Sequence, residues 1–295
     1  MSTAAKMRAW MPQPASVQAV EEQGERIDVP HDGGFVCWRR FGEGSPLVLL
    51  HGGHGSWMHW LRNIPALAER HTVWVPDLPG FGDSSDVPDD GTPHGPLQRL
   101  MDALDETLST VLGDLPEVDV AAFSFGALVT AHLHRRGRLM RRIALLGPAA
   151  HSGPRGPEVS IPPWRHTDTA ATREDALRRN LLAFMFHRSA SADAAALYAQ
   201  EYSSLRCRLR VVREVSRASR LGELLHDFET PMLCAWGAQD CTAIAAEVGP
   251  MLCDNSPQRT WRVLDGAAHW VQHERADATN ALLLSWFAAN VEQVV

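Results

Sequence analysis

The chain has 295 residues, of which 45% are apolar and 21% charged, a globular composition that excludes disordered, collagen-like and coiled-coil chains. Its 28 basic and 35 acidic side chains leave a net charge of −7, which argues against a non-specific binder of nucleic acid or of an anionic membrane. No apolar run reaches the ~18 residues of a membrane span, and we expect no signal peptide in residues 1–18. The five scattered cysteines lack metal-ligand spacing and favour a cytoplasmic protein with reduced thiols.

Short apolar runs alternate with helical patterns along most of the chain. The runs predict strands at residues 21–29, 34–41, 46–50, 71–76, 118–123, 142–146, 231–236 and 259–264. Helical periodicity covers residues 56–70, 96–112, 126–137, 243–253 and 276–291. The pattern predicts an α/β fold with a mostly parallel eight-stranded sheet, helices on both faces, and the first two strands as an antiparallel edge.

One long segment breaks this alternation. Residues 152–225 open with a loop rich in proline and glycine and continue with helical periodicity but no convincing strand. We interpret them as a helical cap, or lid, over the carboxyl edge of the sheet. The core then comprises residues 25–151 and 226–295, and residues 1–24 form an N-terminal extension.

A serine lies between a predicted strand and a predicted helix. The run Ala122-Phe123-Ser124-Phe125-Gly126 matches the G-x-S-x-G nucleophile elbow, with alanine at the first glycine. Such a turn forces the serine to a positive φ and needs small residues two positions away on either side. A serine there is also an ordinary helix N-cap, so the pentapeptide alone leaves both interpretations open.

Two further residues follow later strand ends in the order that a catalytic triad on this architecture requires. Asp240 comes just after the strand at 231–236, and His269 just after the strand at 259–264. We predict that Asp240 orients the imidazole and that His269 takes the proton of Ser124 and returns it to the leaving group. Asp265 is the rival acid, but it lies on the histidine's own loop and is interpreted as structural.

An oxyanion hole needs backbone N–H groups that point to the developing charge. We expect Phe125, at the start of the helix, to supply one N–H group and Gly53, in the glycine-rich turn after the third strand, to supply the other. His51 then braces this turn, and the turn at residues 80–84 is structural.

With these residues in this order, the chain resembles the α/β-hydrolase superfamily over nearly all of its length after about residue 25. It looks most like the capped hydrolases that include the meta-cleavage-product C–C hydrolases, because residues 269–277 (HWVQHERAD) are similar to the segment after their catalytic histidine. The resemblance implies the α/β-hydrolase fold and a catalytic triad of Ser124, Asp240 and His269.

The chain also departs from that group at two places. Phe123 replaces the asparagine that precedes the group's serine, and residues 190–205 lack the cap arginine that grips an acidic substrate. Arg206 is a candidate substitute for that arginine. Epoxide hydrolases and haloalkane dehalogenases differ further, since they carry an aspartate where this chain has Ser124.

We therefore expect a serine hydrolase that forms an acyl-enzyme with a small, largely apolar ester or lactone and needs no metal or organic cofactor. C–C cleavage of a vinylogous diketo acid is the alternative activity, and a slow or non-catalytic ligand-binding protein is the alternative class. The expected partner is a small-molecule substrate, and we expect no binding of nucleic acid or of a membrane. The oligomeric state stays open, with a homodimer as one alternative. The expected substrate contacts are the aromatic residues Trp270, Phe123, Phe184, Phe186 and Trp164.

Overall fold

The computed structural model describes residues 11–88, 95–113, 117–165, 169–209 and 212–289. Its centre is an eight-stranded sheet with the strand order β1-β2-β4-β3-β5-β6-β7-β8. The strands are β1 (Glu25–His31), β2 (Gly34–Phe41), β3 (Ser45–Leu50), β4 (His71–Pro76), β5 (Val118–Phe123), β6 (Met140–Leu146), β7 (Met232–Gly237) and β8 (Arg259–Leu264). The predicted α/β fold with a mostly parallel eight-stranded sheet is confirmed.

The sheet is parallel except at one edge. β2 pairs antiparallel with both β1 and β4, and all other neighbouring strands are parallel. Every residue of β5 and of β7 is buried, which is why these strands read as continuous apolar runs and not as alternating ones. The central parallel strands bring their carboxyl ends to one edge of the sheet.

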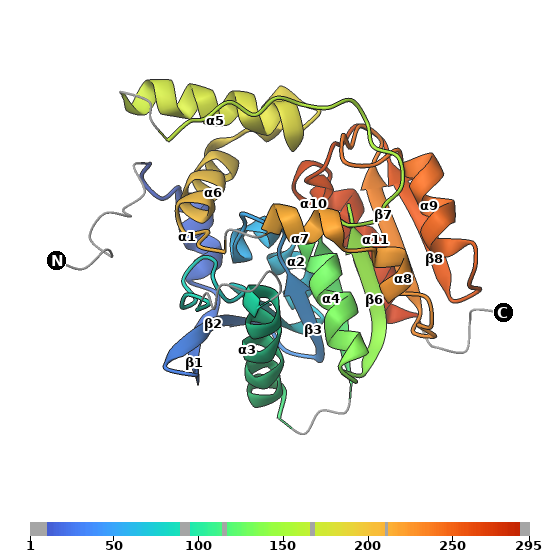
Figure 1. The fold of residues 1–295 in the computed structure, drawn as a ribbon. Coiled ribbons are helices and arrows are strands. Elements are labelled where there is room, and N and C mark those ends of the chain that lie inside the picture. Colours follow the sequence, from blue (N-terminus) through green and yellow to red (C-terminus); the bar gives the residue numbers. More distant parts are fainter. Residues whose placement is uncertain (1–10, 89–94, 114–116, 166–168, 210–211, 290–295) are drawn as a thin grey trace.

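Helices cover both faces of the sheet, and each face has its own apolar core (Figure 1). One core includes side chains of α3 (Gly95–Leu112), α4 (Phe125–Arg135) and α9 (Ala245–Cys253). The other includes side chains of α1 (Ala15–Glu21), α2 (Ile64–Ala68) and α11 (Ala276–Ala288). The remaining elements of the core are the 3₁₀ helix η2 (Trp57–Trp60) and α10 (Val271–Glu274).

The segment between β6 and β7 contains the helical insertion. It comprises α5 (Ala170–Phe184), η3 (Ser189–Ser191), α6 (Ala194–Leu205), α7 (Val212–Ala218) and α8 (Leu221–Leu224). Its described residues include no strand. Figure 1 shows α5 and α6 standing away from the sheet as a separate layer. Tyr202 on α6 ties this cap to the core, because its hydroxyl donates a hydrogen bond of 2.5 Å to Asp83.

Two local predictions were wrong. The strand predicted at residues 21–29 begins only at Glu25, because Glu21 ends α1, whose Val17 and Val20 pack into the core. The single helix predicted at residues 56–70 is two short helices, η2 and α2. Ser56 caps the first of them through its side chain. Pro65 is the second residue of the other and lies in its first turn, where a helix accepts proline. Residues 1–10 of the predicted extension and 290–291 of the last predicted helix lie outside the described residues.

Two further features bear on the chain's surroundings. No helix in the described ranges is both long and apolar enough to cross a membrane. All five cysteines are free thiols.

Candidate active site

Ser124 occupies the sharp turn between β5 and α4. Its φ of 50° and ψ of −112° lie in a region that side chains rarely adopt and that is typical of functional turns. The turn is crowded, since a Cβ on Gly126 would lie 2.7 Å from the carbonyl oxygen of Leu50. A Cβ on Gly52 would lie 3.1 Å from the Cβ of Ser124. These contacts explain the glycine at position 126 in this turn and the glycine at position 52 in the loop after β3 that packs against the serine.

The structure brings Ser124, His269 and Asp240 into one hydrogen-bonded chain. The Oγ of Ser124 lies 3.0 Å from Nε2 of His269, and Nδ1 of His269 lies 2.9 Å from Oδ2 of Asp240. The imidazole and the carboxylate are both buried. This geometry allows proton transfer from the hydroxyl to the imidazole, with the carboxylate fixing the ring and its tautomer.

Thr242 supports the carboxylate and was not found by sequence reasoning. Its hydroxyl and its backbone N–H both donate to Oδ1 of Asp240, at 2.7 and 2.8 Å. Burial alone raises the pKa of Asp240, but the charge of His269 and the hydrogen bonds from His269 and Thr242 outweigh it, so the pKa is lowered. The available signal was a threonine two residues after an aspartate, a spacing at which the aspartate side chain caps its own turn.

Gly147 is a second residue that the sequence did not single out. It follows β6 with a φ of +49°, and a Cβ there would lie 3.1 Å from the ring of His269 and 3.2 Å from Oδ2 of Asp240. A glycine at this strand end therefore lets the backbone approach the imidazole closely.

The two predicted N–H donors stand beside the serine. Phe125 is the first residue of α4, so its N–H has no acceptor within the helix. Gly53 directly follows Gly52, which packs against Ser124. Within the described residues neither amide donates a hydrogen bond to another group. His51 holds the turn in place, because it accepts from the N–H of Leu78 at 2.9 Å and donates to the carbonyl of Gly52 at 2.8 Å.

Four of the five expected substrate contacts are packing residues in this structure. Trp270 and Phe123 have no exposed surface, and Phe186 and Trp164 are also buried. The indole of Trp270 donates to the carbonyl of His59 and stacks on Phe186. Because these two side chains are almost wholly buried, they offer no surface to a ligand in this structure.

Phe123 and Trp164 have comparable packing roles. The ring of Phe123 lies 4.9 Å from that of His269 and supports it. Trp164 packs within the cap, where Arg165 and Arg173 lie over its ring.

Phe184 is the aromatic residue whose place still fits a ligand contact. Its half-buried ring meets that of His269 edge-on, with 5.3 Å between the ring centres. Val212 on α7 also lies next to the site, since a Cβ on Gly53 would lie 2.7 Å from its side chain. Sequence reasoning missed Val212, because a helical pattern does not show which loop a residue of that helix contacts.

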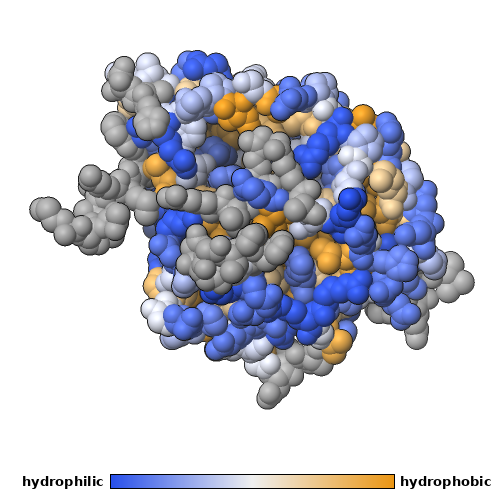
Figure 2. All heavy atoms as spheres, in the orientation of Figure 1, coloured by the Kyte–Doolittle hydropathy of each residue, from blue (hydrophilic) through white to orange (hydrophobic). Residues whose placement is uncertain are grey.

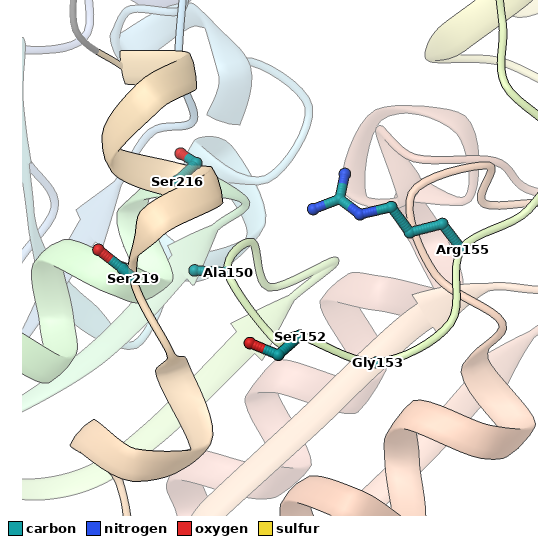
Figure 3. A pocket seen from close by; sticks show the side chains of 6 residues that line it. All are labelled: Ala150, Ser152, Gly153, Arg155, Ser216 and Ser219. Atoms are coloured by element: carbon teal, nitrogen blue, oxygen red, sulfur yellow. The ribbon is translucent and has the colours of Figure 1, made fainter.

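A pocket of about 300 Å³ lies beside this site. Figure 3 shows Ser152 and Arg155 on the loop after β6, and Ser216 and Ser219 on or just after α7. The loop is held to the site at its start, where the N–H of Ala149 donates to the carbonyl of Ser124. Ala150 and Ser152 have φ angles of 64° and 60°, so the loop that forms one wall is under backbone strain.

Among the described residues, one cluster of side chains has the composition of a metal site, namely Cys37, Asp77 and Asp83. Both carboxylates accept hydrogen bonds from the buried guanidinium of Arg39, at 3.1 and 2.6 Å. Burial raises the pKa of the Cys37 thiol, which keeps it protonated. Since the guanidinium already supplies the positive charge, this cluster is an internal ion pair that holds the turn at residues 80–84.

The fold and the site define a hydrolase of the α/β class, and comparison with known proteins agrees. The model of the "Alpha/beta hydrolase family" matches residues 47–282, so the chain belongs to the alpha/beta hydrolase family.

Several relatives have named functions. The chain is 28% identical over 271 residues to a dihydrolipoyllysine-residue acetyltransferase component of an acetoin cleaving system from Pseudomonas putida, covering 86% of this chain and 67% of that protein. It is 28% identical over 273 residues to a 2-hydroxy-6-oxo-6-phenylhexa-2,4-dienoate hydrolase from Burkholderia cepacia, covering 84% of this chain and 89% of that protein. The crystal structure of the esterase RhEst1 from Rhodococcus sp. ECU1013 superposes with a TM-score of 0.72 at 21% identity, covering 90% and 99% of the two chains. That last likeness is one of fold.

Proposed function

We propose that this chain is a serine hydrolase that cleaves a small, largely apolar ester or lactone through an acyl-enzyme, without a metal or an organic cofactor. One observation carries the proposal, the continuous hydrogen-bonded path from Ser124 through His269 to Asp240. A strained serine that only capped a helix would need neither the imidazole nor the buried carboxylate behind it.

The geometry supports the following sequence of steps. The Oγ of Ser124 attacks the ester carbonyl while Nε2 of His269, 3.0 Å away, takes its proton. The carbonyl oxygen gains negative charge, which the N–H groups of Phe125 and Gly53 stabilise. His269 then protonates the leaving alkoxide, and the acyl group stays on Ser124. Water, deprotonated by the same imidazole, releases the acid.

Asp240 keeps its negative charge throughout this cycle. Its lowered pKa matches a group that stabilises the imidazolium formed in each half-reaction and is not itself protonated. The hydrogen bonds from Thr242 leave one carboxylate oxygen for His269.

The surroundings of the serine favour an apolar acyl group. Phe184 and Val212 from the cap lie over His269 and Gly53, as their contacts with these residues place them. Figure 2 shows apolar patches on this face close to α5 and close to α7. Burying an apolar acyl chain there contributes about 25 cal/mol per Å² of surface removed from water.

C–C bond hydrolysis is the second candidate, and the dienoate hydrolase relative at 28% identity favours it. The residue that would have to grip the acid of such a substrate is Arg206. Its guanidinium stacks 3.6 Å from the centre of the Tyr202 ring, and its Nη1 has no hydrogen-bond partner among the described residues. Ester hydrolysis remains the first choice because Phe184 and Val212 make the surroundings of the serine apolar.

The direct test is the hydrolysis of p-nitrophenyl butyrate by the wild-type chain and by Ser124→Ala. We expect turnover by the wild type and only the background rate for the variant, with unchanged circular dichroism. Equal turnover by a folded Ser124→Ala variant would remove this serine from the mechanism. A ring-fission dienoate serves as the comparison substrate. If its visible absorption band is lost faster than the ester is hydrolysed, C–C bond hydrolysis becomes the favoured activity.

A further inference from the structure

Glu274 is a buried carboxylate that the proposed reaction does not use. It ends α10, five residues after His269, and its side chain has no exposed surface. Its oxygens accept four hydrogen bonds. Oε2 receives the N–H groups of Ala268 and His187 at 2.8 and 3.0 Å, and Oε1 receives the N–H of Arg188 and the hydroxyl of Ser191 at 2.6 and 3.0 Å.

These donors come from two different parts of the molecule. Ala268 immediately precedes His269, whereas His187, Arg188 and Ser191 belong to the cap segment at residues 184–191, which we call the cap clasp. Glu274 therefore joins the histidine loop to the cap through one side chain.

The cap clasp also holds the other side of His269. The N–H of Trp270 donates to the carbonyl of Met185 at 3.0 Å, and the ring of Phe184 lies against the imidazole. The backbone N–H groups of the residues before and after His269 are thus both bonded, that of Ala268 to Glu274 and that of Trp270 to the clasp itself.

The charge of Glu274 makes this arrangement depend on the cap. Its closest cation is Arg188, whose Nε lies 3.9 Å away on a side chain that is 52% exposed. A buried carboxylate whose one ion pair is this long and solvent-exposed relies mainly on hydrogen-bond donors. Three of its four donors belong to the cap clasp, so a cap that moved away would expose the carboxylate to water, which then competes with the N–H of Ala268.

We propose that Glu274 is a positioning residue that sets the place of His269 through Ala268 and makes that place depend on a seated cap. Only the role of His269 in this statement rests on the proposed function. The consequence is that the proton-transfer path to Ser124 is complete when the cap clasp is docked and is loosened when it is not.

Two conservative substitutions separate position from charge. Glu274→Asp keeps the charge but is one methylene shorter, so its carboxylate does not reach both Ala268 and the clasp. Glu274→Gln keeps the length. Its single carbonyl oxygen is able to face Ala268 and His187, while its NH₂ group donates to the hydroxyl of Ser191. The N–H of Arg188, which bonds Oε1 in the wild type, then loses its acceptor, but this change lies in the cap clasp and leaves Ala268 bonded.

We expect kcat for p-nitrophenyl butyrate to fall roughly 10–100-fold in Glu274→Asp, because a misplacement of about 1 Å has an effect of that order. Glu274→Gln keeps kcat within about threefold of the wild type, and KM changes less than about twofold in both variants. Ser191→Ala is the matched control, since it removes one cap donor and leaves Ala268 bonded, and it changes kcat less than about twofold.

A second readout needs no substrate. The proton on Nδ1 of His269, hydrogen-bonded to Asp240, gives a low-field NMR signal that we expect in the wild type, in Glu274→Gln and in Ser191→Ala, but broadened or lost in Glu274→Asp. Thermal unfolding shows that each variant is folded at the assay temperature. A wild type that lacks esterase activity but shows this pattern of signals would contradict the proposed function and support the positioning role.

The inference is overturned if folded Glu274→Asp keeps both the wild-type kcat and the low-field signal. It is equally overturned if kcat falls further in Glu274→Gln than in Glu274→Asp. The charge of residue 274, and not the length of its side chain, would then be what His269 requires.

Discussion

Asp240 and Thr242 show how a buried acid is kept ionised beside the histidine. The carboxylate has no exposed surface on its side chain, and burial favours its neutral form. The donors from Thr242 and His269 reverse this preference and lower the pKa. The threonine hydroxyl is also 3.1 Å from Nδ1 of His269, so it shapes both partners of this pair.

Removing that hydroxyl tests its contribution. Thr242→Val deletes the 2.7 Å hydrogen bond to Oδ1 of Asp240 but leaves the backbone donor. A hydrogen bond to a charged group contributes about 1.5–3 kcal/mol, so we expect kcat/KM for the ester to fall at least about tenfold. The pKa of Asp240 rises when a donor to its charged form is lost, so the acid limb of the kcat/KM profile shifts to higher pH.

Thr242→Ser is the matched control for this change, because it keeps the hydroxyl and removes only a methyl group. It should retain the wild-type pH profile. If Thr242→Val and Thr242→Ser have the same profile as the wild type, the hydroxyl has no part in keeping Asp240 charged.

At the scale of the element, the turn between β5 and α4 decides where the serine stands. Ala122 at its start and Gly126 at its end are both small, and a Cβ on Gly126 would lie within 3 Å of the carbonyl oxygens of Leu50 and His51. The chain thus tolerates alanine at one end of the turn and requires glycine at the other.

The exchange of these two residues gives a paired prediction. Gly126→Ala places a Cβ 2.7 Å from the carbonyl oxygen of Leu50, and such overpacking destabilises a protein by about 1–3 kcal/mol. It also displaces Phe125, so activity falls with stability. Ala122→Gly costs about 0.5–1 kcal/mol and leaves turnover unchanged. Urea unfolding and ester hydrolysis of both variants check this, and an active, fully stable Gly126→Ala variant would contradict the packing of the turn.

The sequence predicted this turn and the strands beside it well, for a physical reason. Strands such as β5 are buried on both faces, so the apolar run in the sequence has the same ends as the strand. Reactive residues that follow such a run are therefore easy to recognise. The contacts of the cap were not predictable in the same way. Whether Trp270 faces a ligand or His59 depends on how the cap clasp and η2 pack, and residue spacing along the chain does not contain that information.

At the scale of the whole molecule, many histidines are buried in a neutral form. Burial lowers the pKa of His51, His59, His71, His132, His134, His151 and His273, the last to about 3. His51 needs its neutral form, because its Nε2 accepts a hydrogen bond. The unfolded chain has no such constraint, and its histidines titrate at about 6.5.

This difference predicts the pH dependence of stability. Below about pH 6.5 the histidines of the unfolded chain bind protons that the buried histidines of the folded chain do not bind. The free energy of unfolding therefore falls as the pH falls. Each wholly buried group such as His51 or His59 contributes about 1.4 kcal/mol per pH unit. Asp119, whose burial raises its pKa to about 6, acts in the opposite direction but is one group against several. Urea unfolding should show a lower midpoint at pH 5.5 than at pH 7.5, and an equal or higher midpoint at pH 5.5 would contradict this.

The central claim is that Ser124 is a nucleophile activated by His269. It is tested most directly by treating the folded protein with a fluorophosphonate and measuring the intact and peptide masses. We predict a single adduct on Ser124, formed rapidly by the wild type and absent from Ser124→Ala and His269→Ala. Folded wild-type protein that gains no adduct, or gains it on another residue, would contradict the claim.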